Sequence, residues 1–159
     1  MKKSLLANLF YKNAEQTPNK EAVWCDGKMV SYAEMAELVS RYSNLLLSLN
    51  VAHGDHIAIP MNNSIESVAL FFSAADLGLC VVPLNPSLPF DAVKTAINAG
   101  DIKHLIARKI FFSECEKNGG IDIPGFSICL DQDYPGATPF EKIKEMPVTR
   151  PELDYDVDD

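Results

Sequence analysis

Apolar residues along this chain recur at two spacings, one typical of helices and one typical of strands. The clearest helix is expected over residues 32–49, where apolar positions repeat every three or four residues opposite a polar face. Its start carries a capping box, because the Ser31 oxygen can accept a backbone amide while Glu34 reaches back. Before it, Asp26-Gly27 separates two short apolar runs and therefore predicts a β-hairpin.

Through the middle of the chain, short apolar runs alternate with helical segments. Strands are expected at 56–59, 79–82, 104–107 and 126–130, with helices at 64–77, 89–98 and 110–117. The continuously apolar run 79–82 predicts a strand buried on both faces. The helix before it is apolar nearly all round, so we expect it to be covered on both sides. The order predicts an α/β fold, with a mostly parallel sheet flanked by helices and an N-terminal β-hairpin.

The two ends of the chain have different characters. A first helix is expected between a Ser4 cap and Thr17, and the residues assigned to its buried face are Leu5, Leu6, Leu9 and Phe10. After residue 130 the chain is rich in proline and then in acidic residues, without a core-forming pattern. We therefore expect residues 1–130 to form an N-terminal α/β subdomain and 131–159 to form a linker.

The composition narrows the class of partner. The chain is 47% hydrophobic, and 14 Lys+Arg against 22 Asp+Glu give a net charge of −8, which argues against a nucleic-acid partner. No run reaches the roughly 20 apolar residues of a membrane span. No signal-peptide pattern follows Lys2 and Lys3, so we expect a cytoplasmic protein. The cysteines at 25, 80, 115 and 129 lack metal spacing and are expected to be buried free thiols.

The residues show no assembled active site. The glycines match neither phosphate-binding pattern of α/β proteins. His53 and His56 with Asp55 could place metal ligands in one turn, but a surface turn is the simpler interpretation, and His104 is interpreted as structural. The aspartates 154, 156 and 158 alternate as in a calcium loop but lack its closing glutamate. We therefore expect no catalytic, cofactor-binding or metal-binding residue.

Four segments, taken in order, resemble the N-terminal portion of the adenylate-forming superfamily: acyl-CoA synthetases, luciferases and the adenylation domains of peptide synthetases. Residues 9–19 are similar to the family's opening helix, and 30–35 to its "(L/V)(T/S)YxEL" element. Residues 54–59 are similar to its "GDrVAI" strand. Most specific is 77–86, Leu-Gly-Leu-Cys-Val-Val-Pro-Leu-Asn-Pro, which is close to "kaGavvvPLNP".

The resemblance implies part of the N-terminal subdomain of an acyl-CoA synthetase-like fold. The resemblance is greatest to fatty-acid–CoA ligases. The parent protein would use ATP and Mg²⁺ to convert a carboxylic acid, here a fatty acid, into an acyl-adenylate, and coenzyme A would then accept the acyl group. Residues 156–159 are similar to the acidic segment before the family's phosphate loop, and no residue here matches that loop or the later motifs. The resemblance thus implies that the chain alone is inactive and that its partner is the remainder of the adenylation domain.

Two other interpretations stay open. One is a fragment of an amino-acid-activating or acyl-carrier-protein-charging adenylation domain. The other is a non-catalytic α/β module that acts by protein–protein contact. The identity of the acid and the acceptor thiol is not specified by these residues. A chain that lacks its remaining domain exposes apolar surface, so we also expect homo-oligomers.

Overall fold

The computed structural model describes residues 4–60 and 62–154, which divide between two compact units. Unit 1 takes in the chain up to Gly54, then Asn63–Leu79, and the chain from Ile143 onward. Unit 2 takes in Asp55–Asn62 and Cys80–Lys142. The boundary expected at residue 130 is not tested by this division and stays a prediction.

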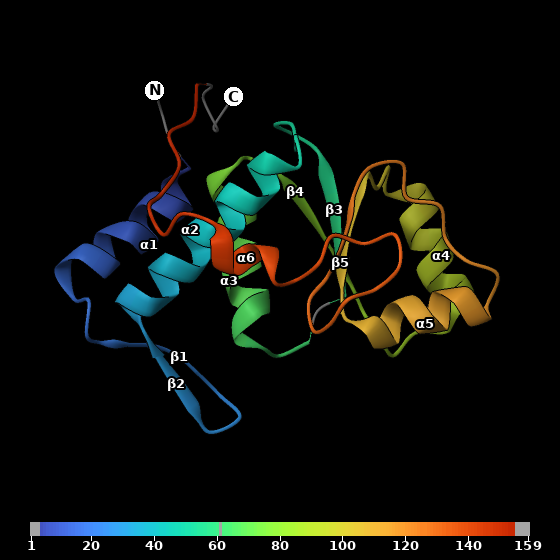
Figure 1. Cartoon of the computed structure of the whole chain (residues 1–159), viewed down its shortest axis with the longest axis horizontal. Helices are drawn as coiled ribbons and strands as arrows, with labels where there is room; N and C mark the ends of the chain where they lie inside the picture. Colours follow the sequence, from blue (N-terminus) through green and yellow to red (C-terminus); the bar gives the residue numbers. More distant parts are fainter. Residues whose placement is uncertain (1–3, 61, 155–159) are drawn as a thin grey trace. The chain divides into compact units, whose positions relative to one another are not determined.

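Unit 1 is built from helices and a two-stranded ribbon. Its elements are α1 (Leu5–Gln16), β1 (Glu21–Cys25), β2 (Lys28–Ser31), α2 (Tyr32–Ser48), α3 (Ile65–Asp76) and α6 (Lys142–Glu145), whose first residue belongs to unit 2. The antiparallel pairing of β1 with β2 confirms the predicted hairpin (Figure 1). Asp26 and Gly27 both adopt positive φ in its turn, 50° and 78°, which glycine tolerates at little cost.

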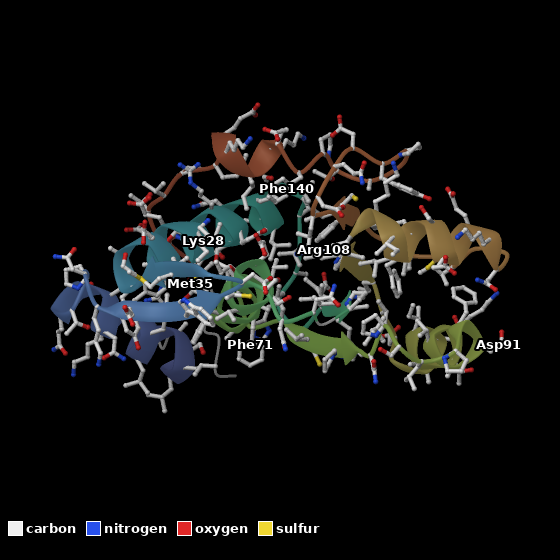
Figure 2. The ribbon with its side chains drawn as sticks, turned by 90° about the horizontal axis from the view of Figure 1, so that it is seen from below. Lys28, Met35, Phe71, Asp91, Arg108 and Phe140 are labelled. Atoms are coloured by element: carbon white, nitrogen blue, oxygen red, sulfur yellow. The ribbon has the colours of Figure 1, made fainter. Side chains whose placement is uncertain are left out.

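Helix α2 starts and packs as its sequence predicts. The Ser31 Oγ accepts the Glu34 N–H at 3.3 Å, and a Glu34 carboxylate oxygen accepts the Ser31 N–H at 2.8 Å. This backbone hydrogen bond lowers the pKa of Glu34. The predicted apolar stripe is confirmed for its buried members, which are Met35, Val39, Tyr42, Leu45 and Leu46. Figure 2 labels Met35 among the side chains of this unit.

The predicted buried face of α1 is confirmed at Phe10 and wrong at Leu5, Leu6 and Leu9. Ser4 caps the helix and Thr17 ends it as expected, but Leu5, Leu6 and Leu9 are 69%, 42% and 51% exposed. The buried stripe is instead Ala7, Phe10 and Ala14, which packs toward α2 and α3. Both stripes have helical spacing, so periodicity alone could not choose between them. The stripe with two alanines lets the helices approach closely, and Phe10 stacks on Phe72 with ring centroids 4.4 Å apart.

Helix α3 is also less covered than its composition predicts. Phe71 is 45% exposed, so the expectation of burial on both sides is wrong at this position. The buried side of α3 includes polar groups: Ser73, fully buried, donates its hydroxyl to the carbonyls of Val39 and Ala69 at 2.9 and 2.8 Å. These bonds satisfy a hydroxyl that would otherwise be costly to bury.

Unit 2 is a parallel sheet with helices on it. Its elements are β3 (His56–Pro60), β4 (Cys80–Leu84), α4 (Phe90–Ala99), β5 (His104–Ala107), α5 (Lys109–Lys117) and β6 (Ser127–Cys129). All strand pairs are parallel, in the order β4-β3-β5-β6, which confirms the predicted fold class. In Figure 1, α4 and α5 lie together on one side of these strands.

The core of unit 2 lies between the sheet and these two helices. The strands contribute small and branched side chains, and the helices contribute larger ones; the buried members are Ala58, Leu84, Leu105, Ala107 and Cys129 from the sheet, with Val93, Ile97 and Phe112 from the helices and Ile102 from a loop. Small residues on the sheet leave room for the helix side chains, which is how an interior reaches close packing.

Strand β4 corrects the prediction of a strand buried on both faces. It lies at the edge of the sheet, and Cys80 at its start is exposed. An edge position fits Pro83, which has no N–H to donate to a neighbour on its outer side. The prediction of buried free thiols is accordingly wrong for Cys80, whereas Cys115 and Cys129 are buried and free.

Candidate functional site

The candidate site is a cavity of about 380 Å³ at the carboxyl ends of the strands in unit 2. Strands β3 and β5 are neighbours in the sheet, but the chain continues from β3 to β4 on one side and from β5 to β6 on the other. In open α/β sheets, ligands bind where such connections diverge, outside the carboxyl ends of the strands. We call this space the edge cavity.

The walls of the edge cavity come from the segments that follow three strands. Pro60 ends β3 and Asn62 follows it, the loop 86–88 follows β4, and Arg108 follows β5. The remaining lining residues lie on the two helices and are Phe90, Val93, Ile110, Phe111, Glu114 and Cys115. Most of the wall is apolar with a few polar groups, which is the usual composition of small-molecule sites.

The exit from β4 is shaped by the residues of the "PLNP" motif. After Leu84 ends the strand, the Asn85 side-chain oxygen accepts the Ser87 N–H at 2.9 Å. The Leu88 N–H also bonds to the Asn85 carbonyl, at 3.2 Å. Such an Asx turn reverses the chain locally and delivers Ser87 and Leu88 to the cavity wall. The motif therefore has a structural role here, in agreement with its interpretation as a strand exit.

Charged groups at the edge cavity lie on and next to α5. Arg108 is the N-cap residue of this helix and is exposed (Figure 2), and Glu114 follows on the helix. The first amide of the helix, that of Lys109, donates to the Asp131 carboxylate at 2.9 Å. The cavity thus combines an apolar interior with one cation and one anion in its lining, which fits a small amphipathic molecule.

Cys115 is the thiol in the lining of the edge cavity, and its buried environment lowers its reactivity. Burial raises the pKa of its thiol to about 11. Because the thiolate is the reactive form, the thiol stays protonated at neutral pH. Cys115 is therefore a poor nucleophile at neutral pH.

The amino ends of the strands hold the residues considered as metal ligands. Asp55 accepts hydrogen bonds from Lys103 Nζ at 2.6 Å and from His104 Nε2 at 3.0 Å, and His56 Nδ1 lies 2.5 Å from the Gly100 carbonyl oxygen. Asp55 and His56 are thus hydrogen-bonded to other residues of unit 2. Over residues 4–60 and 62–154, no three side chains of His, Cys, Asp or Glu gather as a metal site would need.

His104 is structural in this arrangement. Its Nδ1 accepts the Phe126 N–H at 3.2 Å, so the proton sits on Nε2 and is donated to Asp55. The ring also stacks on Phe126 with centroids 4.0 Å apart. The acidic segment 156–159 lies outside the described residues, and so do two of the three aspartates of the possible calcium pattern. That the chain holds no catalytic, cofactor-binding or metal-binding residue stays a prediction.

Sequence analysis missed the edge cavity and its lining residues, Arg108 above all. The available signal was positional, since the lining segments directly follow strands that were predicted correctly. Which strands are neighbours decides whether those segments meet, and that order was not predicted. Within the described part of the chain, no helix is both long enough and apolar enough to cross a membrane.

The family of AMP-binding enzymes matches residues 10–154, and the chain belongs to this family. The match covers the hairpin, all four strands of the parallel sheet and the edge cavity. It agrees with the resemblance drawn from the four sequence segments.

Curated proteins named for several different substrates are similar in sequence to parts of this chain. The chain is 36% identical over 77 residues to long-chain-fatty-acid–CoA ligase FadD13 of Mycobacterium tuberculosis, which covers 48% of this chain and 15% of that protein. It is 30% identical over 101 residues to 2-succinylbenzoate–CoA ligase of Oceanobacillus iheyensis, and the match covers 63% of this chain and 21% of that protein. It is 25% identical over 103 residues to surfactin synthase subunit 2 of Bacillus subtilis, and the match covers 65% of this chain and 3% of that protein. The chain therefore spans about a fifth or less of these relatives.

Solved structures share the fold. The anthranilate CoA ligase AuaEII in complex with anthranoyl-AMP superposes with a TM-score of 0.81 at 20% identity, covering 90% of this chain and 28% of that one. The N-terminal domain of FACL13 from Mycobacterium tuberculosis superposes with a TM-score of 0.80 at 22% identity, covering 98% and 39%. At these identities the likeness concerns the fold.

Proposed function

We propose that this chain supplies the N-terminal scaffold of an ATP-dependent acid–thiol ligase, with a fatty acid as the acid and coenzyme A as the thiol. The observation that carries the proposal is the family match over residues 10–154, on a parallel sheet whose strands contain the quoted motifs in order. The choice of a fatty acid is supported by the 36% identity to the FadD13 ligase.

ATP, Mg²⁺ and coenzyme A belong to this proposal for the whole enzyme. In this proposal the residues that hold ATP and its metal are not among the described ones. The one glycine pair here, Gly119-Gly120, ends α5 rather than following a strand. Gly120 donates to the Cys115 carbonyl at 2.7 Å, as a helix stop does. In this proposal the groups that neutralise phosphate charge lie on another segment, and no chemical step runs through these residues.

The second candidate is a domain that activates an amino acid or charges a carrier protein. The similarity to surfactin synthase subunit 2 supports it, at 25% identity over 103 residues. A non-catalytic module that acts by protein–protein contact is the third candidate. The cytoplasmic location also stays a prediction.

A chimeric enzyme tests the scaffold role. Residues 10–154 would replace the matching segment of the FadD13 ligase, and acyl-adenylate and acyl-CoA formation would be measured with fatty acids and with amino acids. The proposal expects a folded chimera that makes fatty acyl-CoA. A folded chimera that turns over neither product would contradict it, and activity with amino acids alone would favour the second candidate.

The chain by itself gives a complementary test. We expect no ATP–pyrophosphate exchange and no micromolar ATP affinity in calorimetry, because the phosphate-binding groups are assigned to another segment. Acyl-adenylate production by the 159-residue chain alone would overturn the scaffold proposal.

Self-association is also part of the proposal. Leu5, Leu9 and Phe71 of unit 1 are large apolar side chains left exposed, and such surface favours contact between copies. Light scattering that shows only a monomer at high concentration would count against it.

A further inference from the structure

The last described residues of unit 1, Ile143–Asp154, are bound through their main-chain carbonyls by side chains of α2, and we call this segment the strap. No core-forming pattern is visible in this part of the sequence, yet Ile143 and Leu153 are buried, with 4% and 6% of their surface exposed. Apart from the single turn of α6, the strap has no regular structure, so its backbone finds partners elsewhere.

Two side chains on α2 bind the backbone of the strap. The Arg41 guanidinium donates from Nη1 to the carbonyls of Ile143, Lys144 and Met146, at 3.3, 2.7 and 2.9 Å. One turn further along α2, the Asn44 amide donates to the carbonyls of Pro147 and Thr149, at 3.1 and 2.9 Å. In Figure 1, α6 lies beside α2. Because each contact is to a main-chain oxygen, this recognition does not depend on the strap's side chains.

A third side chain, Arg150, fastens the far end of the strap to two other helices. Its Nε donates to the two carboxylate oxygens of Asp76 at 2.9 and 3.2 Å, and its Nη2 also binds Asp76. Its Nη1 donates to the Asn8 side chain at 2.9 Å, and the guanidinium lies over the Tyr11 ring, 4.4 Å from the centroid. A planar guanidinium can make all these contacts at once.

The contacts that hold the strap differ from those that hold the helices. Helices α1, α2 and α3 pack on one another through fully buried apolar residues such as Met35, Val39 and Ala69. The strap adds few buried apolar side chains and is fastened mainly through half-buried or exposed hydrogen bonds. Segments of this kind open locally at a lower free energy than the whole fold.

We propose that the strap is a detachable segment, docked on α2 by main-chain recognition and latched by Arg150, which opens as a unit while α1, α2 and α3 stay folded. Closed, it pairs Arg150 with the buried Asp76 carboxylate. The inference does not depend on the proposed ligase function.

Limited proteolysis of the 159-residue protein tests the proposal. Trypsin cleaves after Lys144, whose carbonyl is held by Arg41, so cleavage there requires opening. The Arg41→Ala, Asn44→Ala double variant removes the donors and keeps good helix formers on α2. We expect cleavage after Lys144 to rise by about tenfold or more, because charge-assisted bonds are lost and each 1.4 kcal/mol is tenfold. Amide exchange in α2 and α3, followed by mass spectrometry, should change less than about twofold by the same reasoning.

The matched control is Thr149→Ala. It removes an exposed side chain of the strap but leaves the carbonyl that Asn44 binds, so cleavage after Lys144 should stay at the wild-type rate. Unchanged cleavage in the double variant would overturn the proposal. Loss of protection in α2 and α3 together with the strap would also overturn it, since the strap would then be part of the cooperative fold.

A second measurement covers the case in which the double variant fails to fold. In the wild-type protein, exchange of strap amides at low urea should depend weakly on urea, because a small opening exposes little surface. Exchange of α2 amides should depend on it strongly. Equal dependence in both segments would overturn the proposal.

Discussion

Among residues 4–60 and 62–154, each unit buries one aspartate, and the two carboxylates are paired with different cations. Asp76 ends α3 in unit 1, and its side chain is 2% exposed against an Arg150 side chain that is 19% exposed. Asp55 precedes β3 in unit 2, with its side chain 7% exposed, and it is shared between Lys103, 51% exposed, and the buried His104. Asp76 is paired with one partly buried cation, whereas Asp55 divides its bonds between a solvated cation and an imidazole.

The difference lies in where the partners come from. His104 begins β5, the neighbour of β3 in the sheet, and Lys103 directly precedes it, so strand pairing brings both to Asp55. Arg150 reaches Asp76 from 74 positions away along the chain, at the end of the strap. A buried carboxylate that loses its only cation is left uncompensated, which costs far more than the pair itself is worth. Unit 1 should therefore be the unit more sensitive to loss of one partner.

The largest effect is expected for Arg150→Met. The methionine keeps much of the apolar stem but removes the cation from Asp76, so the free energy of unfolding should fall by about 3–4 kcal/mol. Urea denaturation followed by circular dichroism measures the loss. Adding Asp76→Asn to the same variant should recover a large part of it, since the buried charge is then gone.

The matched change in unit 2 is Lys103→Met. It should lower the free energy of unfolding less than Arg150→Met does, because the lysine is half exposed and Asp55 keeps its bond to His104. Equal losses in the two variants would contradict the comparison.

A second effect is expected at Gly125, which lies against the His104 ring. A Cβ there would overlap the ring and lie 2.6 Å from the Lys103 carbonyl oxygen, a backbone atom that cannot move aside cheaply. Gly125→Ala should cost about 2–3 kcal/mol by overpacking, measured by urea denaturation.

Gly119→Ala is the control for this substitution. A Cβ at Gly119 meets no atom within 4 Å, and the only strain comes from its φ of +87°. Its cost should be about 1 kcal/mol. If the two alanine variants lose the same stability, the close approach at His104 is not what requires glycine at Gly125.

The last effect appears only at high pH and concerns Tyr11, whose ring lies beneath the Arg150 guanidinium. Burial raises the pKa of Tyr11 to about 12, although the hydrogen bond with the Ser40 hydroxyl acts in the opposite direction. Because the pKa of Tyr11 is higher in the folded than in the unfolded protein, the protonated phenol stabilises the fold. This stabilisation is complete below pH ~10, the unfolded pKa, and is lost as the pH rises toward 12. Unfolding free energies should fall by about 2 kcal/mol over this window, and Tyr11→Phe should remove that fall. A pH dependence unchanged in Tyr11→Phe would show that another group titrates there.

Local signals predicted the elements well. The capping box at Ser31 and Glu34, the Asp26-Gly27 turn and the helix stop at Gly119-Gly120 each act within a few residues, so the sequence contains all of their partners. The same is true of the parallel strands, whose apolar runs and intervening helices define an α/β fold. These features also carried the family resemblance that the match over residues 10–154 agrees with.

Contacts between distant residues could not be predicted in the same way. Which apolar stripe of α1 is buried, whether β4 is an edge strand, and which side chain meets Asp76 all depend on neighbours that are remote in sequence. The edge cavity exists only because three strand ends meet, and the strap docks only because Arg41 and Asn44 face main-chain carbonyls more than 100 positions away. The sequence by itself determined the helices, strands, turns and family; tertiary structure decided burial, charge pairing and the cavity, because those depend on which elements become neighbours in space.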